Sequence, residues 1–331
     1  EVLKQNQNRI RIIQCAHSGP AAARNAAIEA AAGELIAFMD ADDLCTPDRL
    51  RLSVEKLETE RLHLVASALS FIDSSGKALP GIWTCPPQAS NDYWGALLER
   101  NWMGTPSVLV RRSVLEKVGL FDENFTNAED YDLWLRIGQD HSHSIGFIDA
   151  PLIRCRRHSS NTSIHIERHQ HFERLALQKV GRRRAHQALC RLHEGDGQAQ
   201  AEAWIWFLLR RGDAAFRDEA TFAISRYPES DSMRFALGVF QHDAGQYTEA
   251  LRTFIFLKRR DTAALHNVGV LMALYGDPDA GAAHIQTALE LQPDYYDARQ
   301  NLTTIQNGGR LRITRRPFRP QPVAMILGGL L

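Results

Sequence analysis

The amino-acid sequence predicts an α/β domain followed by an all-α domain of helical repeats. In the first half of the chain, segments with the apolar pattern of strands alternate with segments that favour helices, which is typical of an α/β layer fold. After about residue 198 the pattern is helical throughout. Glycines at 212, 245 and 276 recur there at spacings of 33 and 31 residues. These spacings are close to the period of about 34 residues in helix–turn–helix repeats.

Composition and charge limit the classes of function. The chain has 331 residues, 44% of them hydrophobic, which is enough for the cores of two domains. Lys plus Arg and Asp plus Glu both total 39, so the formal net charge is zero. A general nucleic-acid-binding protein needs a basic surface, and we therefore expect no nucleic-acid partner.

The cysteines and the apolar segments bear on the compartment. The five cysteines are far apart and form no C-x-x-C pair, so neither a zinc ribbon nor a disulfide scaffold is expected. No apolar run reaches the length of about 18 residues that spans a bilayer. We expect a cytoplasmic protein, with peripheral attachment at the inner face of the membrane left open. The chain begins with Glu1 and ends in VAMILGGLL, so we expect a fragment of a longer protein.

The first elements of the α/β domain follow from local patterns. Residues 9–14 alternate like a short strand. The alanine-rich segment 18–33 predicts a helix that a glycine ends. Residues 35–39 are apolar without interruption, as in a buried parallel strand. Thr46 as cap and Pro47 at the first position predict that a second helix starts there.

The remaining elements follow in less regular order. Residues 62–72 form another strand-like apolar run, PSVLVR and SIGFID also favour strands, and YWGALLER and SVLEKVG favour helices. The basic residues at 312–320 predict solvated charge. We expect an α/β domain over 1–165, a helical linker over 166–197, helical repeats over 198–310 and a tail over 311–331.

Three acids, Asp40, Asp42 and Asp43, follow the predicted strand at 35–39. Carboxylates this close together repel one another unless a cation lies between them. In an open α/β sheet, ligands bind beyond the carboxyl ends of the strands, so the cluster favours a divalent cation or a phosphate site. The alternative is that the acids only form a turn and cap the next helix.

The segment around these acids, SGPAAARNAAIEAAAGELIAFMDADDLCTPDRL, resembles the middle of family 2 glycosyltransferases of the GT-A fold, a Rossmann-like α/β architecture. In that family an Asp-x-Asp element binds the diphosphate of a nucleotide-sugar donor through Mn²⁺ or Mg²⁺. The resemblance implies that this element is Asp40-Ala41-Asp42, with Asp42 as the main metal ligand and Asp40 against the ribose or sugar. It also places Arg24 among the donor-binding residues.

A second element, FDENFTNAEDYDLWLRIG at 121–138, resembles the Glu-Asp segment of the same family. The resemblance implies that Asp130 is the general base, which takes the proton from the acceptor hydroxyl, and that Glu129 positions this base or touches the acceptor. An inverting transfer needs one such base. From position alone, the alternative is that Asp130 caps the helix that follows.

Two further segments extend the expected site. IRCRRHSSNTS contains Arg156, Arg157 and His158. The resemblance implies a loop over the diphosphate in which His158 ligates the metal and Arg157, or alternatively Arg156, faces phosphate. The alternative is a solvated loop. GTPSVLVRR at 104–112 resembles the segment beside the acceptor site, and the alternative there is a simple core strand.

The transferase resemblance covers residues 5–165 and lacks the family's first strands, which supply the acid that binds the nucleoside. The helical part resembles tetratricopeptide repeats, with copies near 231–261 and 262–295 whose small residues let paired helices approach closely. The expected function is sugar transfer from a nucleotide-diphosphate sugar to a glycan, lipid-linked or protein acceptor, with a protein partner on the repeats. The alternative is a repeat adaptor with an inactive transferase domain.

Overall fold

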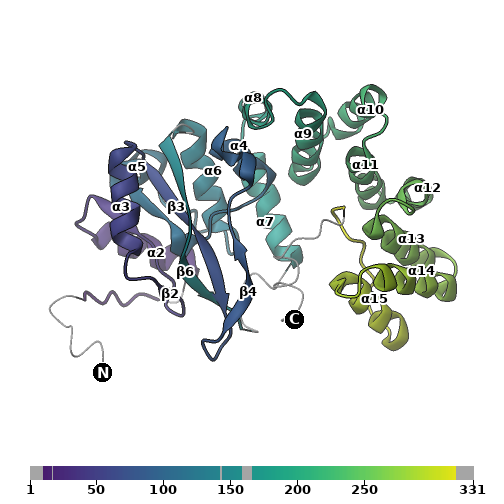
Figure 1. Ribbon diagram of the computed structural model, residues 1–331, viewed down its shortest axis with the longest axis horizontal. Helices are drawn as coiled ribbons and strands as arrows, with labels where there is room; N and C mark the ends of the chain where they lie inside the picture. Colours follow the sequence, from purple (N-terminus) through teal and green to yellow (C-terminus); the bar gives the residue numbers. More distant parts are fainter. Residues whose placement is uncertain (1–9, 17, 142–143, 159–165, 318–331) are drawn as a thin grey trace.

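A computed structural model of the chain describes residues 10–16, 18–141, 144–158 and 166–317. A mixed β-sheet flanked by helices forms the N-terminal part, and helices arranged as an arc form the C-terminal part (Figure 1). None of the described helices is long and apolar enough to cross a membrane. The two architectures therefore follow each other along the chain in the predicted order.

The sheet is built around β3. Its strands are β1 (Leu35–Ala37), β2 (Leu44–Cys45), β3 (Leu64–Ile72), β4 (Ala78–Trp83), β5 (Leu109–Arg111) and β6 (Ile145–Arg156). They lie in the order β1-β5-β3-β6-β2, and β4 pairs with β3 beside this path. β3 and β6 run parallel, whereas the other described pairs are antiparallel. β3 is a central strand and is buried along nearly its whole length, so the strand predicted within 62–72 is confirmed.

The first strand differs from its prediction in direction and burial. β1 lies at the edge of the described sheet and pairs antiparallel with β5. Ile36 and Phe38 are buried, whereas Met39 is 40% exposed, because the side chains of an extended chain point alternately to opposite faces. A continuous apolar run therefore did not mean a strand buried on both faces. The strand predicted at 9–14 is also wrong: residues 10–16 form no regular element in the described part, and they have no strand partner there.

Helices cover the sheet. They are α2 (Gly19–Ala30), α3 (Arg49–Thr59), α4 (Tyr93–Glu99), α5 (Arg112–Val118) and α6 (Glu129–His141), with single 3₁₀ turns at Pro87–Ser90 and Thr105–Ser107. α6 contributes Tyr131 and Trp134, which are fully buried. The Trp134 ring lies against the rings of Phe38 and Phe121. This aromatic group fixes the start of α6 beside the end of β1.

α3 begins later than expected. It starts at Arg49, after a turn at Pro47 and Asp48. The Thr46 hydroxyl, expected to cap this helix, is buried and has no hydrogen-bond partner among the described residues. The reason is that the Thr46 amide donates to the Leu152 carbonyl of β6 at 2.9 Å. Thr46 thus continues the sheet edge instead of turning toward the helix.

The segment predicted as a linker packs on the α/β part. It contains α7 (Ile166–Gln178) and α8 (Arg182–Leu192), and α9 (Gly197–Arg211) follows. α4 and α8 approach so closely that a Cβ added at Gly95 would lie 2.8 Å from the Ala188 carbonyl oxygen. Arg210 of α9 donates to the carbonyls of Leu98 and Glu99 at 2.7 and 2.6 Å. The described hydrophobic core is continuous from the sheet through α9 and on to the later helices.

Six further helices complete the arc: α10 (Phe216–Arg226), α11 (Asp231–Asp243), α12 (Tyr247–Leu257), α13 (Thr262–Tyr275), α14 (Pro278–Leu291) and α15 (Tyr296–Asn307). Consecutive helices pack against each other. α11 and α12 meet at Gly238, where an added Cβ would lie 2.8 Å from the Phe254 ring. α13 and α14 meet at Gly269 and Gly281, where an added Cβ would come within 2.7 Å of the opposite helix. The close approach expected at these small residues is confirmed.

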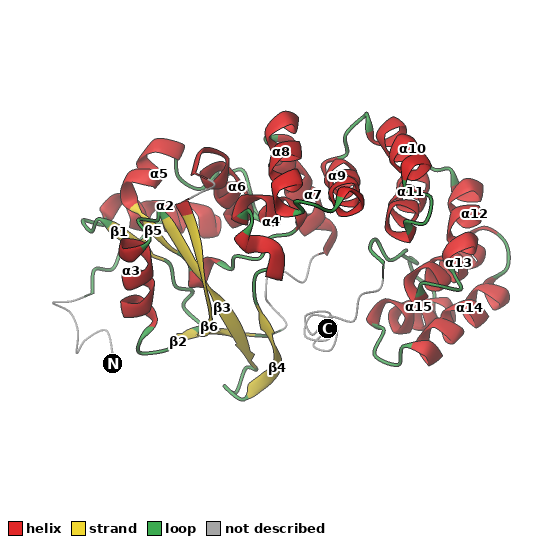
Figure 2. Ribbon diagram, turned by 45° about the horizontal axis from the view of Figure 1, so that its top comes forward, coloured by secondary structure: helices red, strands yellow, loops and turns green. Residues whose placement is uncertain are grey.

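The last described segment, residues 311–317, returns along the inner side of the arc (Figure 1; Figure 2). Ile313 is only 7% exposed. The side chains of two buried asparagines hold the backbone on either side of it. The solvated charge predicted at 312–320 is confirmed for Arg312, whose side chain is 56% exposed, whereas Arg315 is partly buried in an ion pair with Asp243. The prediction did not foresee that Ile313 and the backbone of this segment are held by buried groups.

Candidate active site

The loop after β1 carries the acidic cluster. The Asp43 amide closes its turn by donating to the Asp40 carbonyl at 3.3 Å. The Asp43 carboxylate accepts from the amide of Arg156 in β6 at 2.7 Å, and burial, together with the charges of Asp40 and Asp42, raises the pKa of Asp43. Asp43 thus ties the loop to β6, whereas the Asp40 and Asp42 side chains remain 37% and 43% exposed.

Arg24 of α2 joins the two acidic elements of the sequence. Its Nη2 donates to Asp40 Oδ1 at 3.0 Å and its Nη1 to Glu129 Oε1 at 2.6 Å. Burial alone would lower the pKa of Arg24, but the two carboxylates outweigh burial and raise it. The planar guanidinium can face two acids at once, and so Arg24 links Asp40 and Glu129, which lie 16 and 105 positions from it in the sequence.

Asp130 lies in the first turn of α6, directly after Glu129. Its Oδ2 accepts from the Thr105 hydroxyl at 2.9 Å, and its Oδ1 accepts from the Tyr131 amide at 2.7 Å. An N-cap side chain precedes its helix and accepts from an amide two or three residues further on, so this geometry differs from a cap. Ala128, just before the helix, has φ of 54°, a left-handed conformation that is uncommon for alanine. The backbone is thus bent sharply where the two acids begin.

The environment of Asp130 makes it more basic than an ordinary aspartate. Burial and the neighbouring charge of Glu129 raise the pKa of Asp130 to about 6, against the opposing charge of Arg24. The group is therefore deprotonated at neutral pH and still able to accept a proton. A carboxylate with this pKa suits general base catalysis.

His158 and Asp42 form a second group beside the first. His158 Nε2 lies 2.9 Å from Asp42 Oδ2, and the two side chains are 31% and 43% exposed. Arg156 donates from Nε to the Asp42 carbonyl at 2.8 Å, which fixes the backbone of this pair. Within the described ranges there is no cluster of three or more His, Cys, Asp or Glu side chains in a metal-holding arrangement. The protein thus offers two donors here, one oxygen and one nitrogen.

The Arg157 side chain lies over Phe71 of β3. Its guanidinium carbon is 4.6 Å from the centre of the Phe71 ring, and burial lowers the pKa of Arg157. Its Nε is buried and has no hydrogen-bond partner in the part of the chain that the structure describes. The role in donor binding that the sequence predicts for Arg157 stays a prediction.

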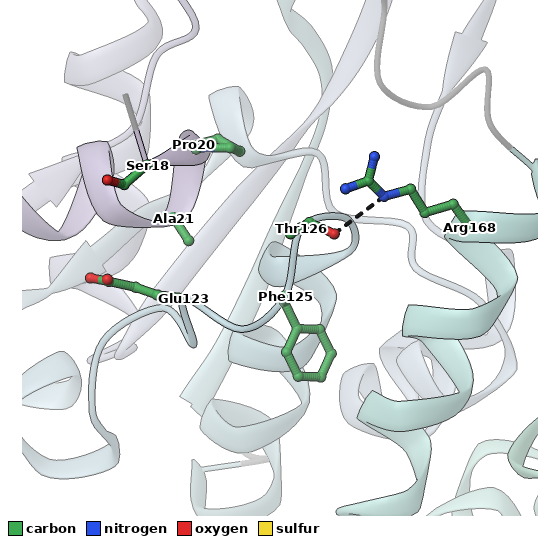
Figure 3. Close-up of a pocket in the computed structure, with 8 residues that line it drawn as sticks. Ser18, Pro20, Ala21, Glu123, Phe125, Thr126 and Arg168 are labelled. Carbon is green, nitrogen blue, oxygen red and sulfur yellow. Dashed lines mark hydrogen bonds between the residues drawn. The ribbon is translucent and has the colours of Figure 1, made fainter. Parts of the chain in front are cut away.

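A cavity of 240 Å³ opens at the N-terminus of α2 (Figure 3). It is lined by Ser18, Gly19, Pro20, Ala21, Glu123, Phe125, Thr126 and Arg168. Arg168 of α7 donates from Nε to the Thr126 hydroxyl at 3.2 Å across it. Arg24 lies one helical turn further along α2 than Pro20. The cavity and the acidic site therefore share α2 as a wall.

The structure joins most of the predicted site residues into two groups. Arg24, Asp40, Glu129 and Asp130 form one group, and Asp42 and His158 form the other. Sequence reasoning missed Thr105 as the partner of Asp130 and Ala128 as the bend before α6. The segment 104–112, which contains Thr105, resembles the segment beside the acceptor site, but no feature of its sequence indicates that Thr105 contacts Asp130. The catalytic and binding roles predicted for the residues of the two groups stay predictions.

Residues 1–119 match the family model described as Glycosyl transferase family 2. This part of the chain is therefore similar to family 2 glycosyltransferases. The match ends before Glu129 and Asp130.

Three curated relatives illustrate the similarity. They are an uncharacterized glycosyltransferase of Nostoc sp. (34% identity over 122 residues, 36% of this chain and 38% of the relative), an uncharacterized glycosyltransferase of Rickettsia felis (29% over 152 residues, 46% and 24%), and UDP-Glc:alpha-D-GlcNAc-diphosphoundecaprenol beta-1,3-glucosyltransferase of Escherichia coli (26% over 175 residues, 53% and 65%). The chain thus spans between 24% and 65% of the length of these relatives. Among solved structures, it is similar to S. aureus TarS 1-349 in complex with UDP-GlcNAc, with a TM-score of 0.44 and 15% identity over 89% of this chain and 79% of that one.

Proposed function

We propose that the α/β domain has the GT-A arrangement and transfers a sugar from a nucleotide-diphosphate sugar to an acceptor hydroxyl, with Asp130 as the general base. The observation that carries this proposal is the Arg24 bridge between Asp40 and Glu129. It supports the proposal because it sets the family's two acidic elements side by side at the carboxyl end of β1. Arg24 also offsets two negative charges, so that an anionic diphosphate can approach.

The proposed reaction needs one proton acceptor. The acceptor oxygen attacks C1 of the donor sugar, the bond from C1 to the diphosphate oxygen breaks, and its electron pair leaves with the diphosphate. The proton of the acceptor hydroxyl passes to Asp130. Thr105 and the Tyr131 amide hold its two oxygens, and Glu129 positions it. With one base opposite the leaving group, we propose that the transfer inverts the configuration at C1.

We further propose that Mn²⁺ or Mg²⁺ binds at Asp42 and His158. The donor set fits such a cation, because a carboxylate oxygen and an imidazole nitrogen face each other at 2.9 Å at an accessible position. Oxygens of the diphosphate would complete the shell. When bound, the cation stabilises the charge that develops on the departing diphosphate. Arg157, whose buried Nε faces no partner within the described residues, is proposed as a further donor-binding residue.

The names of relatives suggest the first substrates to test. The Escherichia coli relatives are named for a UDP-Glc donor and a diphosphoundecaprenol-linked acceptor. We propose a UDP-sugar donor and a lipid-linked glycan acceptor for this chain. A lipid-linked acceptor would be met at a membrane surface, so we also propose a peripheral site of action on the cytoplasmic side.

The experiment is a nucleotide-release assay on the protein as its gene encodes it, with UDP-Glc, the lipid-linked acceptor and Mn²⁺. Asp130→Asn is expected to lower turnover by about 10²- to 10⁴-fold and to change donor binding little, because the lost interaction is made during proton transfer. Asp122→Asn is the matched control, since Asp122 precedes the same helix but pairs with Lys179 at 2.8 Å. Normal turnover of Asp130→Asn with a lowered melting temperature would make Asp130 a structural residue and end the proposal.

For the helical part we propose a tetratricopeptide-like character, with α11–α12 and α13–α14 as two copies. The support is the close approach of the paired helices at Gly238, Gly269 and Gly281. A repeat adaptor with an inactive transferase domain is the second candidate function. The two are separated by the same assay: an adaptor shows no nucleotide release with any donor, whereas a transferase depends on Asp130.

A further inference from the structure

Two buried asparagines hold the segment after α15 through its backbone. Asn301 of α15 donates from Nδ2 to the Arg312 carbonyl at 2.8 Å and accepts the Arg312 amide at 3.1 Å. Asn267 of α13 likewise donates from Nδ2 to the Thr314 carbonyl at 2.8 Å and accepts the Thr314 amide at 2.7 Å. Each asparagine therefore pairs with one residue as a neighbouring β-strand would. We call Asn267 and Asn301 the backbone clamp.

The clamp is supported from behind by buried groups. Asn267 is 0% exposed, Asn301 5% and His266 0%. Asn301 also donates to His266 Nε2 at 2.8 Å, so the imidazole carries its hydrogen on Nδ1, which lies 3.2 Å from Asn267 Oδ1. Burial lowers the pKa of His266 to about 4. One neutral imidazole thus orients both amides, and without a peptide backbone in front of them these buried amides would be left unpaired.

The side chains of the held segment add selectivity around the clamp. Ile313, between the two clamped residues, is 7% exposed and joins the hydrophobic core. The Thr314 hydroxyl donates to Asp297 Oδ2 and contacts the Tyr295 hydroxyl, both at 2.5 Å. Arg315 forms an ion pair with Asp243 of α11. The surroundings therefore suit an apolar residue, a hydroxyl residue and a basic residue in succession.

We propose that the clamp is a binding site for an extended polypeptide, that residues 311–315 occupy it as a ligand in cis, and that a partner segment of the same chemistry displaces them. The clamp recognises amides and carbonyls, which every extended peptide carries. The preferred ligand has an apolar side chain followed by serine or threonine and then arginine or lysine. The inference does not depend on the transferase reaction, since none of these residues belongs to the candidate active site.

A peptide in trans must compete with the cis segment. A tethered ligand has an effective concentration in the millimolar range, so the unmodified chain should bind an added peptide weakly. The variant Ile313→Asp should release the cis segment, because it would bury a carboxylate in the core. The probe is a fluorescent peptide with the sequence of residues 310–317, RLRITRRP, and its binding to the full chain is followed by anisotropy.

Ile313→Asp is expected to bind this peptide at least about 10-fold more tightly than the unmodified chain. Adding Asn267→Ala or Asn301→Ala to it should abolish that gain, whereas Asn307→Ala, an exposed position at the end of α15, should preserve it. A peptide methylated on the amide nitrogen that corresponds to Thr314 tests the clamp without altering the protein. It lacks the hydrogen that Asn267 accepts and should bind at least about 10-fold more weakly.

Two results would overturn the proposal. One is a failure of the peptide to bind Ile313→Asp more tightly than the unmodified chain, which would make residues 311–315 a fixed part of the fold. The other is equal binding of the methylated and unmethylated peptides, which would place the binding elsewhere. Because the second comparison uses one protein, it holds even where an asparagine variant folds poorly.

Discussion

The candidate active site and the backbone clamp treat polar groups in opposite ways. At the candidate active site, Asp40, Asp42 and Glu129 are carboxyl side chains, and the first two remain 37% and 43% exposed. At the clamp, Asn267 and Asn301 are neutral and almost fully buried. At the candidate active site, the charge of Arg24 offsets the charges of Asp40 and Glu129. At the clamp, a peptide backbone satisfies the hydrogen bonds of both amides. The difference lies in what each can exchange with a ligand.

Exposed charges keep their hydration and can be re-paired by an incoming ion, whereas buried amides have no water to fall back on. The active site is therefore suited to a charged ligand that comes and goes with each turnover. The clamp is suited to a ligand that is replaced as a unit and is otherwise kept. The first site should respond to metal, salt and pH, and the second should respond chiefly to peptides.

Removal of divalent metal should produce the largest difference between the two sites, because it should lower transfer and leave peptide binding unchanged. Dialysis against EDTA is expected to lower transfer by about 100-fold or more, because the departing diphosphate loses its counter-charge. Asp42→Asn should have a similar effect in the presence of Mn²⁺. Peptide binding to the clamp, measured on the same samples, should not change. Full transfer activity in EDTA would contradict the proposed metal role of Asp42 and His158.

Replacing Arg24 should sharpen the assignment of the base. The charge of Arg24 lowers the pKa of Asp130, so Arg24→Gln should move this pKa upward from about 6, by about one unit. Turnover falls as pH decreases through the pKa of the base, because the protonated base accepts no proton. The acid limb of the pH–rate profile should therefore shift to higher pH in Arg24→Gln. Arg51→Gln, a change at an exposed pair in α3, is the control, and an unshifted limb in Arg24→Gln would argue against Asp130 as the base.

A smaller effect should separate the sites by pH. The pKa of His266 is lowered to about 4, from about 6.5 in an unfolded chain. Below about pH 6.5 the unfolded form gains a proton that the folded form does not, so this part of the stability is lost as the pH falls toward 4. Amide protection of residues 312 and 314 should thus be intact at pH 6, where turnover is already declining, and reduced by about 10- to 100-fold near pH 4.5. The variant His266→Gln should lose this acid sensitivity; an unchanged response would assign it to another group.

Several residues of the candidate active site could be singled out from the sequence because their pattern is local; their roles stay predictions. Asp40 and Asp42 stand out as acids after an apolar strand, and Glu129 and Asp130 form a recognisable pair before a helix. What no local pattern contains is the Arg24 bridge, because its partners lie 16 and 105 residues away. The direction in which β1 pairs could not be predicted either, because an apolar run such as 35–39 is compatible with parallel and with antiparallel pairing.

The clamp could not be predicted from sequence at all. Asn267 and Asn301 are ordinary polar residues in helical segments, and the segment that they hold reads as a run of basic residues. Asn267 and Asn301 form the clamp only because the fold brings α13, α15 and residues 311–315 together. The helices themselves were predictable from glycine spacing and apolar periodicity. Whether α7 and α8 form a linker or pack on the α/β part depends on contacts such as that of Gly95 with Ala188.

Arg210 links the arc of helices to the α/β part through hydrogen bonds to α4, and this link bears on the cooperativity of unfolding. Its guanidinium satisfies the carbonyls that end α4 and also donates to the buried Tyr131 hydroxyl at 3.2 Å. If either α4 or α9 unfolded, the hydrogen bonds between the Arg210 guanidinium and the carbonyls at the end of α4 would be lost. Heating should therefore unfold the sheet and α7–α9 together in one heat-absorption peak, so that no thermal boundary falls at the start of the helical sequence.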